Sequence, residues 1–296
     1  MKTANKPNKV IILLLLIWSI VIFAKDPAKK IVVSNVGFAT PESVEYNPIE
    51  DVYLVTNING GSLAVDGNGF ISKLKPNGRV IDLKWIDGKK SGVTLNAPKG
   101  AAIVGKHLFV TDIDQVHVFR LSDGQQKKSI TITGSTFLNG ITSGAGDYVY
   151  VTDSGFSAGL EPSGTDAIYK VWASGQYETI IKDKNLGGPN GIWDDDGQLV
   201  VVTFGSGKMI SIDRSGKQTA LPTPPNDKLD GLIKLEDGRF ILSSWGGSAI
   251  YAMNKDHSFT VLASVLDAPA DLGVDTKRKR LLIPLFKENK VVILPF

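Results

Sequence analysis

The 296-residue chain contains no cysteine and only three histidines. The missing cysteine excludes disulfide bonds, thiol nucleophiles and thiolate metal ligands. His107, His117 and His257 fall at a strand start, within a strand and in a hairpin turn, away from the positions where functional side chains are expected. Ser154 and Ser206 lie beside glycines, but no histidine partner supports either as a nucleophile. Zinc or hydrolase chemistry that depends on histidine is therefore not expected.

The formal net charge is low, and the excess of positive charge comes from lysines near the N-terminus. The formal charge of +3 equals the contribution of Lys2, Lys6 and Lys9, since residues 1–24 hold no acid. The remaining chain is neutral, and its basic cluster is the short run at residues 277–280. Because nucleic-acid binders carry extended basic surfaces, we expect no nucleic-acid partner.

Apolar runs longer than a strand are scarce except near the N-terminus, where residues 10–23 are apolar apart from Ser19. Basic residues before this run and the small Ala24 after it give the layout of a secretory signal. The run is shorter than the roughly 20 residues that span a bilayer. Residues 1–24 are therefore predicted to be a signal peptide that exports the protein to the periplasm or out of the cell. Because Ile22 departs from the cleavage pattern, an uncleaved membrane anchor is the alternative.

Glycine is abundant, and part of it recurs in a repeated unit. The second residue of each unit opening lies at position 42, 99, 139, 190, 230 or 271. Most of the intervals are near 40 residues, which is typical of one β-propeller blade. The two longer intervals contain insertions at residues 59–69 and 155–165. Insertions on one face of a repeat usually indicate the working face.

Each unit contains apolar runs of strand length. Second strands are expected at residues 52–56, 108–111, 149–152, 199–203, 240–243 and 281–283, each followed by a third strand. The sixth unit ends at Phe296 after three strands, whereas residues 31–36 form a solitary β-branched run. Pairing this run with the sixth unit would remove an exposed sheet edge. The prediction is an all-β fold: one six-bladed β-propeller domain at residues 25–296, closed by the N-terminal strand in its last blade.

A polar side chain occupies the second position of every unit opening. These side chains are Glu42, Lys99, Asn139, Asn190, Asp230 and Asp271. In a propeller this position precedes the inner strand, so the six are expected to converge at one mouth of the central channel. Asn-Gly and Asp-Gly are also common turn pairs, which is the alternative explanation. Converging carboxylates repel one another in a low-dielectric channel unless a cation binds, and oxygen ligands favour Ca²⁺ over Mg²⁺.

The openings resemble those of the SMP-30/gluconolactonase-like family of six-bladed propellers, over about residues 30–296. The matching motifs are Pro41-Glu42-Ser43-Val44, Leu138-Asn139-Gly140, Pro189-Asn190-Gly191 and Leu229-Asp230-Gly231. The resemblance implies one divalent cation, Ca²⁺ first and Mg²⁺, Zn²⁺ or Mn²⁺ as alternatives, held by Glu42, Asn190 and Asp230 with Asn139 at the same centre. It also implies that Asp230 is the catalytic base in lactone hydrolysis.

The expected substrate contacts are Lys99, Asn139, Asp271 and Trp245. The family often places an arginine near the substrate, and none aligns with a ring position here, so Lys99 would replace it or pair with an acidic ring residue. Trp245 and Phe204 each follow a second strand and are therefore expected beside the ring.

Two functions follow from these residues. The first is an exported metal-dependent hydrolase of a lactone or related ester, with a small molecule as its partner. The second is a non-catalytic propeller that binds a ligand or a protein through the same face, although the sequence carries no sign of a protein partner. A deep cavity beside Trp245 favours hydrolysis, whereas a channel sealed by the insertions favours binding.

Overall fold

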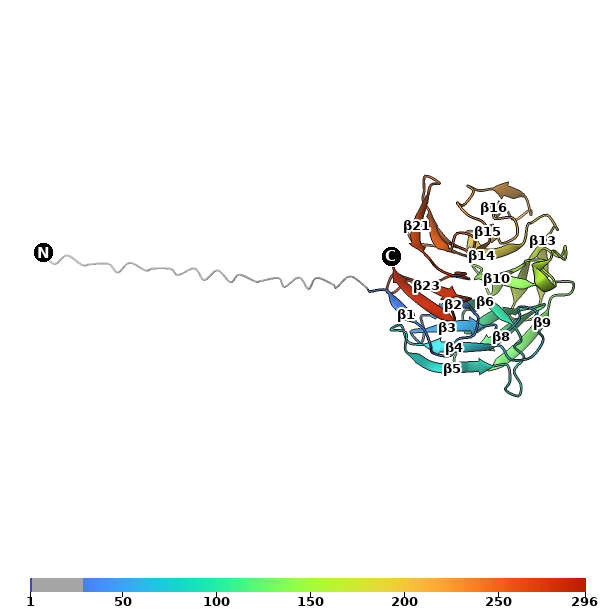
Figure 1. Cartoon of the computed structure of the whole chain (residues 1–296), viewed down its shortest axis with the longest axis horizontal. Helices are drawn as coiled ribbons and strands as arrows, with labels where there is room; N and C mark the ends of the chain where they lie inside the picture. The colour runs from blue at the N-terminus through green and yellow to red at the C-terminus, as the bar shows by residue number, and fades with distance from the viewer. Residues whose placement is uncertain (2–28) are drawn as a thin grey trace.

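A computed structural model of the chain describes Met1 and residues 29–296. This part of the chain is all-β, with six four-stranded sheets arranged around a common centre (Figure 1). One short 3-10 helix, η1 (Ala158–Leu160), interrupts the strands. The predicted six-bladed β-propeller is confirmed. The signal-peptide prediction rests on residues outside the described part.

Each blade is an antiparallel meander that runs outward from the centre in chain order. The first three blades contain β2 (Pro41–Asn47), β3 (Val52–Asn57), β4 (Phe70–Leu74) and β5 (Val80–Asp87); β6 (Pro98–Val104), β7 (His107–Asp112), β8 (Gln115–Arg120) and β9 (Gln126–Thr131); and β10 (Leu138–Ser143), β11 (Tyr148–Asp153), β12 (Ala167–Trp172) and β13 (Tyr177–Lys182).

The remaining three blades follow the same plan, except that the last one takes its outer strand from the other end of the chain. They contain β14 (Pro189–Asp195), β15 (Gln198–Thr203), β16 (Met209–Ile212) and β17 (Gln218–Ala220); β18 (Leu229–Lys234), β19 (Phe240–Ser244), β20 (Ala249–Met253) and β21 (Phe259–Ser264); and β22 (Gly273–Asp275), β23 (Arg280–Leu285), β24 (Lys290–Pro295) and β1 (Ile31–Val33).

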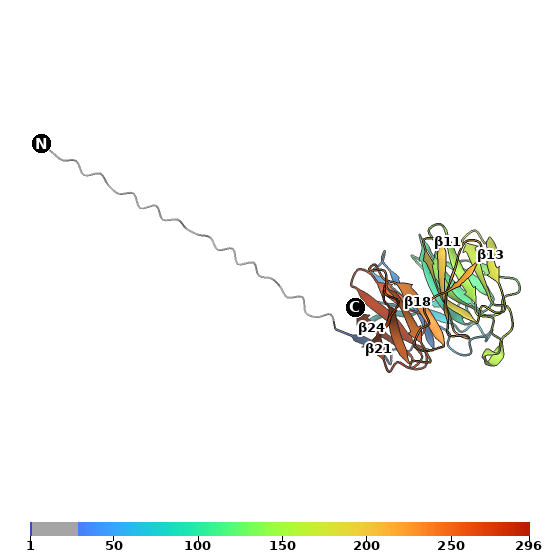
Figure 2. The same cartoon turned by 90° about the horizontal axis from the view of Figure 1, so that it is seen from above.

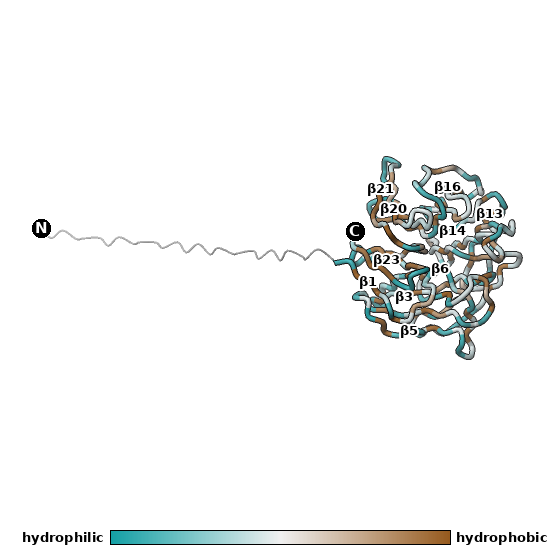
Figure 3. Tube along the Cα trace, viewed as in Figure 1, coloured by the Kyte–Doolittle hydropathy of each residue, from teal (hydrophilic) through white to brown (hydrophobic). Residues whose placement is uncertain are grey.

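The hydrophobic core is divided among the interfaces between blades. Six clusters of buried apolar side chains fill the six interfaces of the described ring. Every residue of β3 is buried, whereas the outer strand β13 is mostly exposed. Hydrophobic and hydrophilic stretches alternate along the chain (Figure 3), and second strands such as β3 are covered by neighbouring blades. This explains why the second strands are apolar without strict alternation, since both of their faces are covered.

The two ends of the described chain close the ring. β1 pairs antiparallel with β24, with Val32 opposite Val292 and Val33 opposite Val291. The view from above in Figure 2 shows β24 beside the point where the described chain begins. The closing strand is thus confirmed, but it ends at Val33 rather than Val36. The backbone turns into the left-handed region at Asn35 (φ 57°), which an extended strand does not adopt.

Glycines let the inner strands approach one another closely at the centre. A Cβ atom on Gly140 would lie 2.2 Å from the carbonyl oxygen of Asn190, and one on Gly191 would lie 2.3 Å from that of Asp230. Neither glycine has a positive φ. The Asn139-Gly140 and Asn190-Gly191 pairs are therefore not turns, and their glycines are required by contact between blades.

The described residues include no helix that is both long and apolar enough to cross a membrane.

Truncating Val33 should destabilise the ring, because this side chain is 5% exposed and packs at the interface between the last and first blades. We expect Val33→Ala to lower the free energy of unfolding by about 2 kcal/mol, from lost burial and the cavity left behind. The adjacent Val32 is 50% exposed, so Val32→Ala is the matched control and should change stability by less than about 0.5 kcal/mol. Urea unfolding measures both, and equal effects would contradict the role of β1 in closure.

Candidate active site at the channel mouth

Hydrogen bonds between blades hold the backbone of the ring residues. In the first three blades, a threonine hydroxyl on the second strand donates to the main-chain carbonyl of the ring residue in the next blade. The bonds run from Thr56 Oγ1 to Lys99 O (2.7 Å), from Thr111 Oγ1 to Asn139 O (2.6 Å) and from Thr152 Oγ1 to Asn190 O (2.9 Å). These bonds use the carbonyl oxygens within the protein. The side chains of the ring residues are left to face the channel.

Five of the six predicted ring residues line one cavity of about 190 Å³ at the mouth of the channel. They are Glu42, Lys99, Asn139, Asn190 and Asp230. All five side chains are buried, and they come from the inner strands of the first five blades. The structure therefore brings together the residues that the repeat placed at equivalent positions.

Asp271 does not line this cavity, and its assigned position in the repeat is wrong by one residue. Pro269 pairs with Leu285 as Leu229 pairs with Ser244 in the preceding blade, so Ala270 is the equivalent of Asp230. Asp271 takes the place that glycine holds in blades two to five, where it bridges Ser43 in the first blade. In blades two to five glycine directly follows the ring residue, whereas Gly273 lies three residues after Ala270, and only strand pairing reveals this offset.

The floor of the cavity holds two buried carboxylates, Glu42 and Asp230. Burial raises the pKa of Glu42 well above its usual value, and the charges of Asp230 and Asp271 raise it further, while Lys99 opposes them. Burial, followed by the charge of Asp271, likewise raises the pKa of Asp230. In a protein without a bound cation, both carboxyl groups therefore resist ionisation.

One oxygen of each carboxylate is left without a partner. Glu42 Oε2 and Asp230 Oδ1 are buried and accept no hydrogen bond from the described residues. Trp245 and Asn190 face Asp230 and favour its charged form. However, Trp245 Nε1 makes no hydrogen bond of normal geometry within the described chain. Buried polar atoms are rarely unpaired in folded proteins, so these oxygens indicate the place of a ligand.

The side-chain oxygen atoms on the floor suit a hard divalent cation. Asn139 Nδ2 donates to Ser154 Oγ at 3.1 Å, which turns its amide carbonyl away from Ser154. Two carboxylates and two amides offer the all-oxygen ligands that Ca²⁺ and Mg²⁺ prefer. Among residues 29–296 no group of three or more His, Cys, Asp or Glu side chains is placed to hold a metal. A site at the ring would therefore depend on Asn139 and Asn190 as well as on the two acids.

Lys99 is buried at the edge of the floor, and its ammonium is held by carbonyls. Nζ donates to Ser62 O at 2.9 Å and to Ala97 O at 3.1 Å, and it lies 4.6 Å from the centre of the Phe137 ring. Burial lowers the pKa of Lys99 to about 8. The sequence suggested that Lys99 could form an ion pair with an acidic ring residue, but its ammonium binds these two carbonyls instead. The ammonium has three N–H groups, so one stays available to a ligand.

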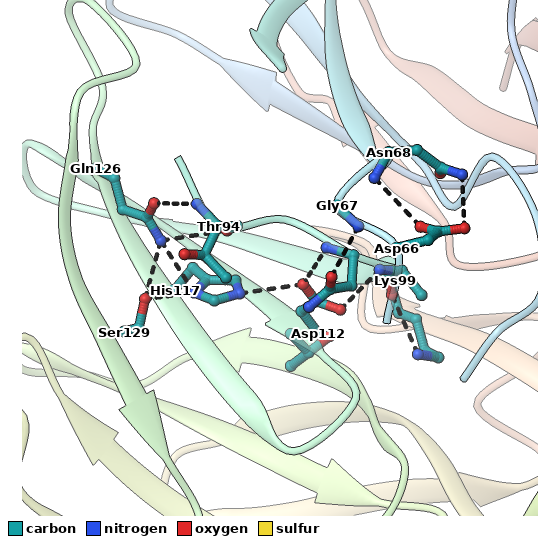
Figure 4. A network of polar contacts seen from close by, with 12 residues as sticks. Asp66, Gly67, Asn68, Thr94, Lys99, Asp112, His117, Gln126 and Ser129 are labelled. Carbon is teal, nitrogen blue, oxygen red and sulfur yellow. Dashed lines mark hydrogen bonds and ion pairs between the residues drawn. The ribbon is translucent and has the colours of Figure 1, made fainter. Parts of the chain in front are cut away.

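A polar network supports the segment that leads to Lys99 (Figure 4). Asp112 accepts hydrogen bonds from the backbone N–H of Asn96 (2.6 Å) and Ala97 (2.8 Å). His117 Nε2 lies 3.1 Å from Asp112 Oδ2, and its Nδ1 lies 2.9 Å from Ser129 Oγ. The serine is on the exposed outer strand β9 and lines no part of the cavity. As expected, His117 lies away from the ring, buried within its blade. It contacts this segment through Asp112 and through Gln126, which accepts a hydrogen bond from the backbone N–H of Thr94.

Residues 155–159 read Gly-Phe-Ser-Ala-Gly, which matches the Gly-x-Ser-x-Gly pattern of serine hydrolases. The structure places Ser157 at the exposed start of η1, where its hydroxyl donates to the carbonyl of Glu161 at 3.0 Å. The pattern requires a turn between a strand and an α-helix, and this loop has neither that geometry nor a histidine bonded to the serine. Ser157 is therefore not a nucleophile of that kind.

A wall of apolar side chains, the collar, rises from the polar floor. Its members are Ile58, Phe137, Phe156, Phe204, Trp245 and Phe286. Four of them directly follow the second strand of their blade, so one repeat position supplies most of the collar. Sequence reasoning found Trp245 and Phe204 by this rule but did not extend it to Ile58 and Phe286.

Both predicted insertions reach the cavity, as expected of a working face. The first contributes Ser62, and the second contributes Phe156 and Leu160. Leu160 lies on η1 at the rim and is 47% exposed. The insertions therefore border the opening and do not seal the channel.

The sequence matches no protein-family model and no curated protein. Solved structures do share the fold. A gluconolactonase from Xanthomonas campestris has a TM-score of 0.69 at 16% identity, over 87% of this chain and 86% of that one. Virginiamycin B lyase from Staphylococcus aureus has a TM-score of 0.61 at 14% identity, over 90% and 98%. A chain of a nidogen and laminin complex has a TM-score of 0.59 at 20% identity, over 75% and 78%. The chain is thus a six-bladed β-propeller with a gluconolactonase-like fold.

Proposed function

We propose that the protein is an exported, divalent-metal-dependent hydrolase of the SMP-30/gluconolactonase type, acting on a lactone or a related ester. The observation that carries this proposal is the pair of buried, unpartnered carboxylate oxygens, Glu42 Oε2 and Asp230 Oδ1, on the floor of an open cavity. Export rests on the leader at residues 1–24. The likeness in fold to a gluconolactonase is compatible with this activity but does not by itself select it.

The cavity favours hydrolysis over the non-catalytic alternative. A channel closed by the insertions would have favoured a binding module, whereas the cavity is open beside Trp245 and has ionisable groups on its floor. Pockets that combine apolar walls with a few converging polar groups and shifted pKa values are typical of active sites.

Each floor residue has a role in the proposed reaction. A divalent cation bound by Glu42, Asn139, Asn190 and Asp230 would polarise the substrate carbonyl and acidify a neighbouring water. We assign Ca²⁺ first, with Mg²⁺, Zn²⁺ and Mn²⁺ as alternatives. Asp230 takes the proton of the attacking water, whose oxygen bonds to the carbonyl carbon, and returns it to the alcohol oxygen when the ester bond breaks. The free N–H of Lys99 would face the substrate, as would Trp245 Nε1.

Neutralising either acid should weaken metal binding, and neutralising Asp230 should also lower turnover. We expect Asp230→Asn and Glu42→Gln to weaken Ca²⁺ binding about 100-fold, because each removes a charged ligand, and Asp230→Asn to lower kcat/KM for a lactone and ester panel by about 10²–10⁴-fold. Calorimetric titration with Ca²⁺ and assays with and without chelator measure the two effects.

The control for this experiment is Asp271→Asn, which removes a neighbouring acid that does not line the cavity. Its effect on Ca²⁺ affinity should be much smaller. Full activity in folded Asp230→Asn protein would remove Asp230 from the mechanism, and full activity after chelation would remove the metal.

The metal-free protein should lose stability as the pH rises from 5 to 8. Burial raises the pKa of Asp271 to about 7 and that of Glu45 to about 8, and it raises those of Glu42 and Asp230 as well. The folded state therefore binds these protons more tightly than the unfolded chain throughout this window, so unfolding becomes easier as they dissociate.

Bound Ca²⁺ favours the charged forms of Glu42 and Asp230 and should reduce this loss, so that the rise in Tm on adding Ca²⁺ is larger at pH 8 than at pH 5. Scanning calorimetry with chelator and with excess Ca²⁺ measures the difference. Glu45→Gln should reduce the pH dependence in chelator, because Glu45 is one of the four acids. Chelated protein that gains stability toward pH 8 would contradict the prediction.

A further inference from the structure

We propose that the cavity selects apolar substrates, namely lactones or esters that carry an aromatic ring or a short alkyl chain, and disfavours polyhydroxylated sugar lactones. This rests on the proposed hydrolase function for the reacting group, but the preference for an apolar ligand stands on the collar alone. The collar side chains above the floor offer carbon surface to a ligand, with Trp245 Nε1 facing the floor.

The aromatic members of the collar form one continuous packed wall. Successive ring centres lie 5.7 Å apart from Phe137 to Phe156, 6.1 Å from Phe156 to Phe204, 5.4 Å from Phe204 to Trp245 and 5.2 Å from Trp245 to Phe286. The first three pairs are edge to face, an arrangement in which aromatic rings attract one another. Because the rings hold each other in place, a ligand finds an apolar wall that is already ordered.

Most polar groups near the collar are already engaged, and the exceptions, Trp245 Nε1 and one N–H of Lys99, lie at the floor beside the place assigned to the reacting carbonyl. Two N–H groups of Lys99 bind carbonyls, Asn139 Nδ2 binds Ser154, and the amide of Asn190 faces Asp230. A sugar lactone would bring several hydroxyl groups against the collar, and each hydroxyl buried without a partner costs about 1–3 kcal/mol. An aromatic ring or alkyl chain carries no such cost and gains from burial.

The size of the cavity limits the group that enters it. Its volume of about 190 Å³ is below the roughly 300–1,000 Å³ of sites that enclose a drug-sized ligand. Apolar surface continues outward at the rim, where Leu160 lines the cavity and the two grooves beside it. We therefore assign the reacting carbonyl and a single ring or short chain to the cavity, with any longer apolar part lying along Leu160.

Two lactams that resist hydrolysis test this preference separately from catalysis. The probes are 3,4-dihydroquinolin-2-one, which has a fused aromatic ring, and D-glucono-δ-lactam, which has hydroxyl groups around the same six-membered amide. Calorimetric titration of the purified protein in Ca²⁺ buffer should give an affinity at least about 10-fold higher for the aromatic lactam. An equal or higher affinity for the sugar lactam, or binding of neither, would overturn the proposal.

Phe204→Ala should lower the affinity for the aromatic lactam about 10-fold or more and leave that for the sugar lactam nearly unchanged, because it removes one wall of the collar. The matched control is Phe296→Ala, which truncates an exposed phenylalanine outside the cavity. Equal effects of the two variants on the aromatic lactam would count against the collar.

The outcomes for the two proposals are distinct. If the aromatic lactam binds as expected but no lactone or ester is turned over with Ca²⁺, hydrolysis fails and the apolar preference stands. If esters are hydrolysed but the sugar lactam binds as well as the aromatic one, the preference fails and hydrolysis stands.

Discussion

The close contact of the inner strands at the centre of the ring is the constraint on which the site depends. At Gly140 and Gly191 the next strand lies so near that even one methyl group would collide with its backbone. Hydroxyl groups such as Thr111 and Thr152 then fix the neighbouring carbonyls. With the backbone held on both sides, the side chain before each glycine faces the channel. Function at the mouth is thus a consequence of how the blades pack.

The same contact creates an electrostatic problem that the protein alone does not resolve. Glu42 and Asp230 are withdrawn from water and stand close enough to raise the pKa of Glu42. Lys99 offsets the repulsion only partly, because its ammonium is committed to two carbonyls. Buried charges persist in proteins when they are paired or bind a metal. A cation at this place would therefore contribute to stability as well as to chemistry, and the two roles share the same oxygens.

Two positions of the repeat supply the residues that line the cavity, one for the floor and one for most of the collar. The position before each inner strand supplies polar groups, and the position after each second strand supplies most of the apolar wall. Polar groups on the floor suit a carbonyl and a cation, whereas the wall above them suits carbon. The two sets lie on different strands of the same blade, and they meet where Trp245 faces Asp230.

The sequence by itself determined the six units, the strand that closes the ring and five of the six ring positions, including Glu42 and Asp230. These features depend on local patterns: apolar runs of strand length, glycine at a regular spacing and β-branched residues at both ends of the chain. It also identified Trp245 as a neighbour of the site, because the residue after a second strand has a predictable place.

Only the tertiary structure decided the rest. The offset that puts Ala270, not Asp271, in the sixth ring position depends on which residue of the second strand pairs with Pro269. The reason for the glycines lies in the neighbouring blade, since the atoms they avoid belong to residues about 40 to 50 positions away. The collar likewise combines Phe137 and Phe156 with residues of three later blades. Such contacts join segments far apart in the chain, and no local pattern of residues records them.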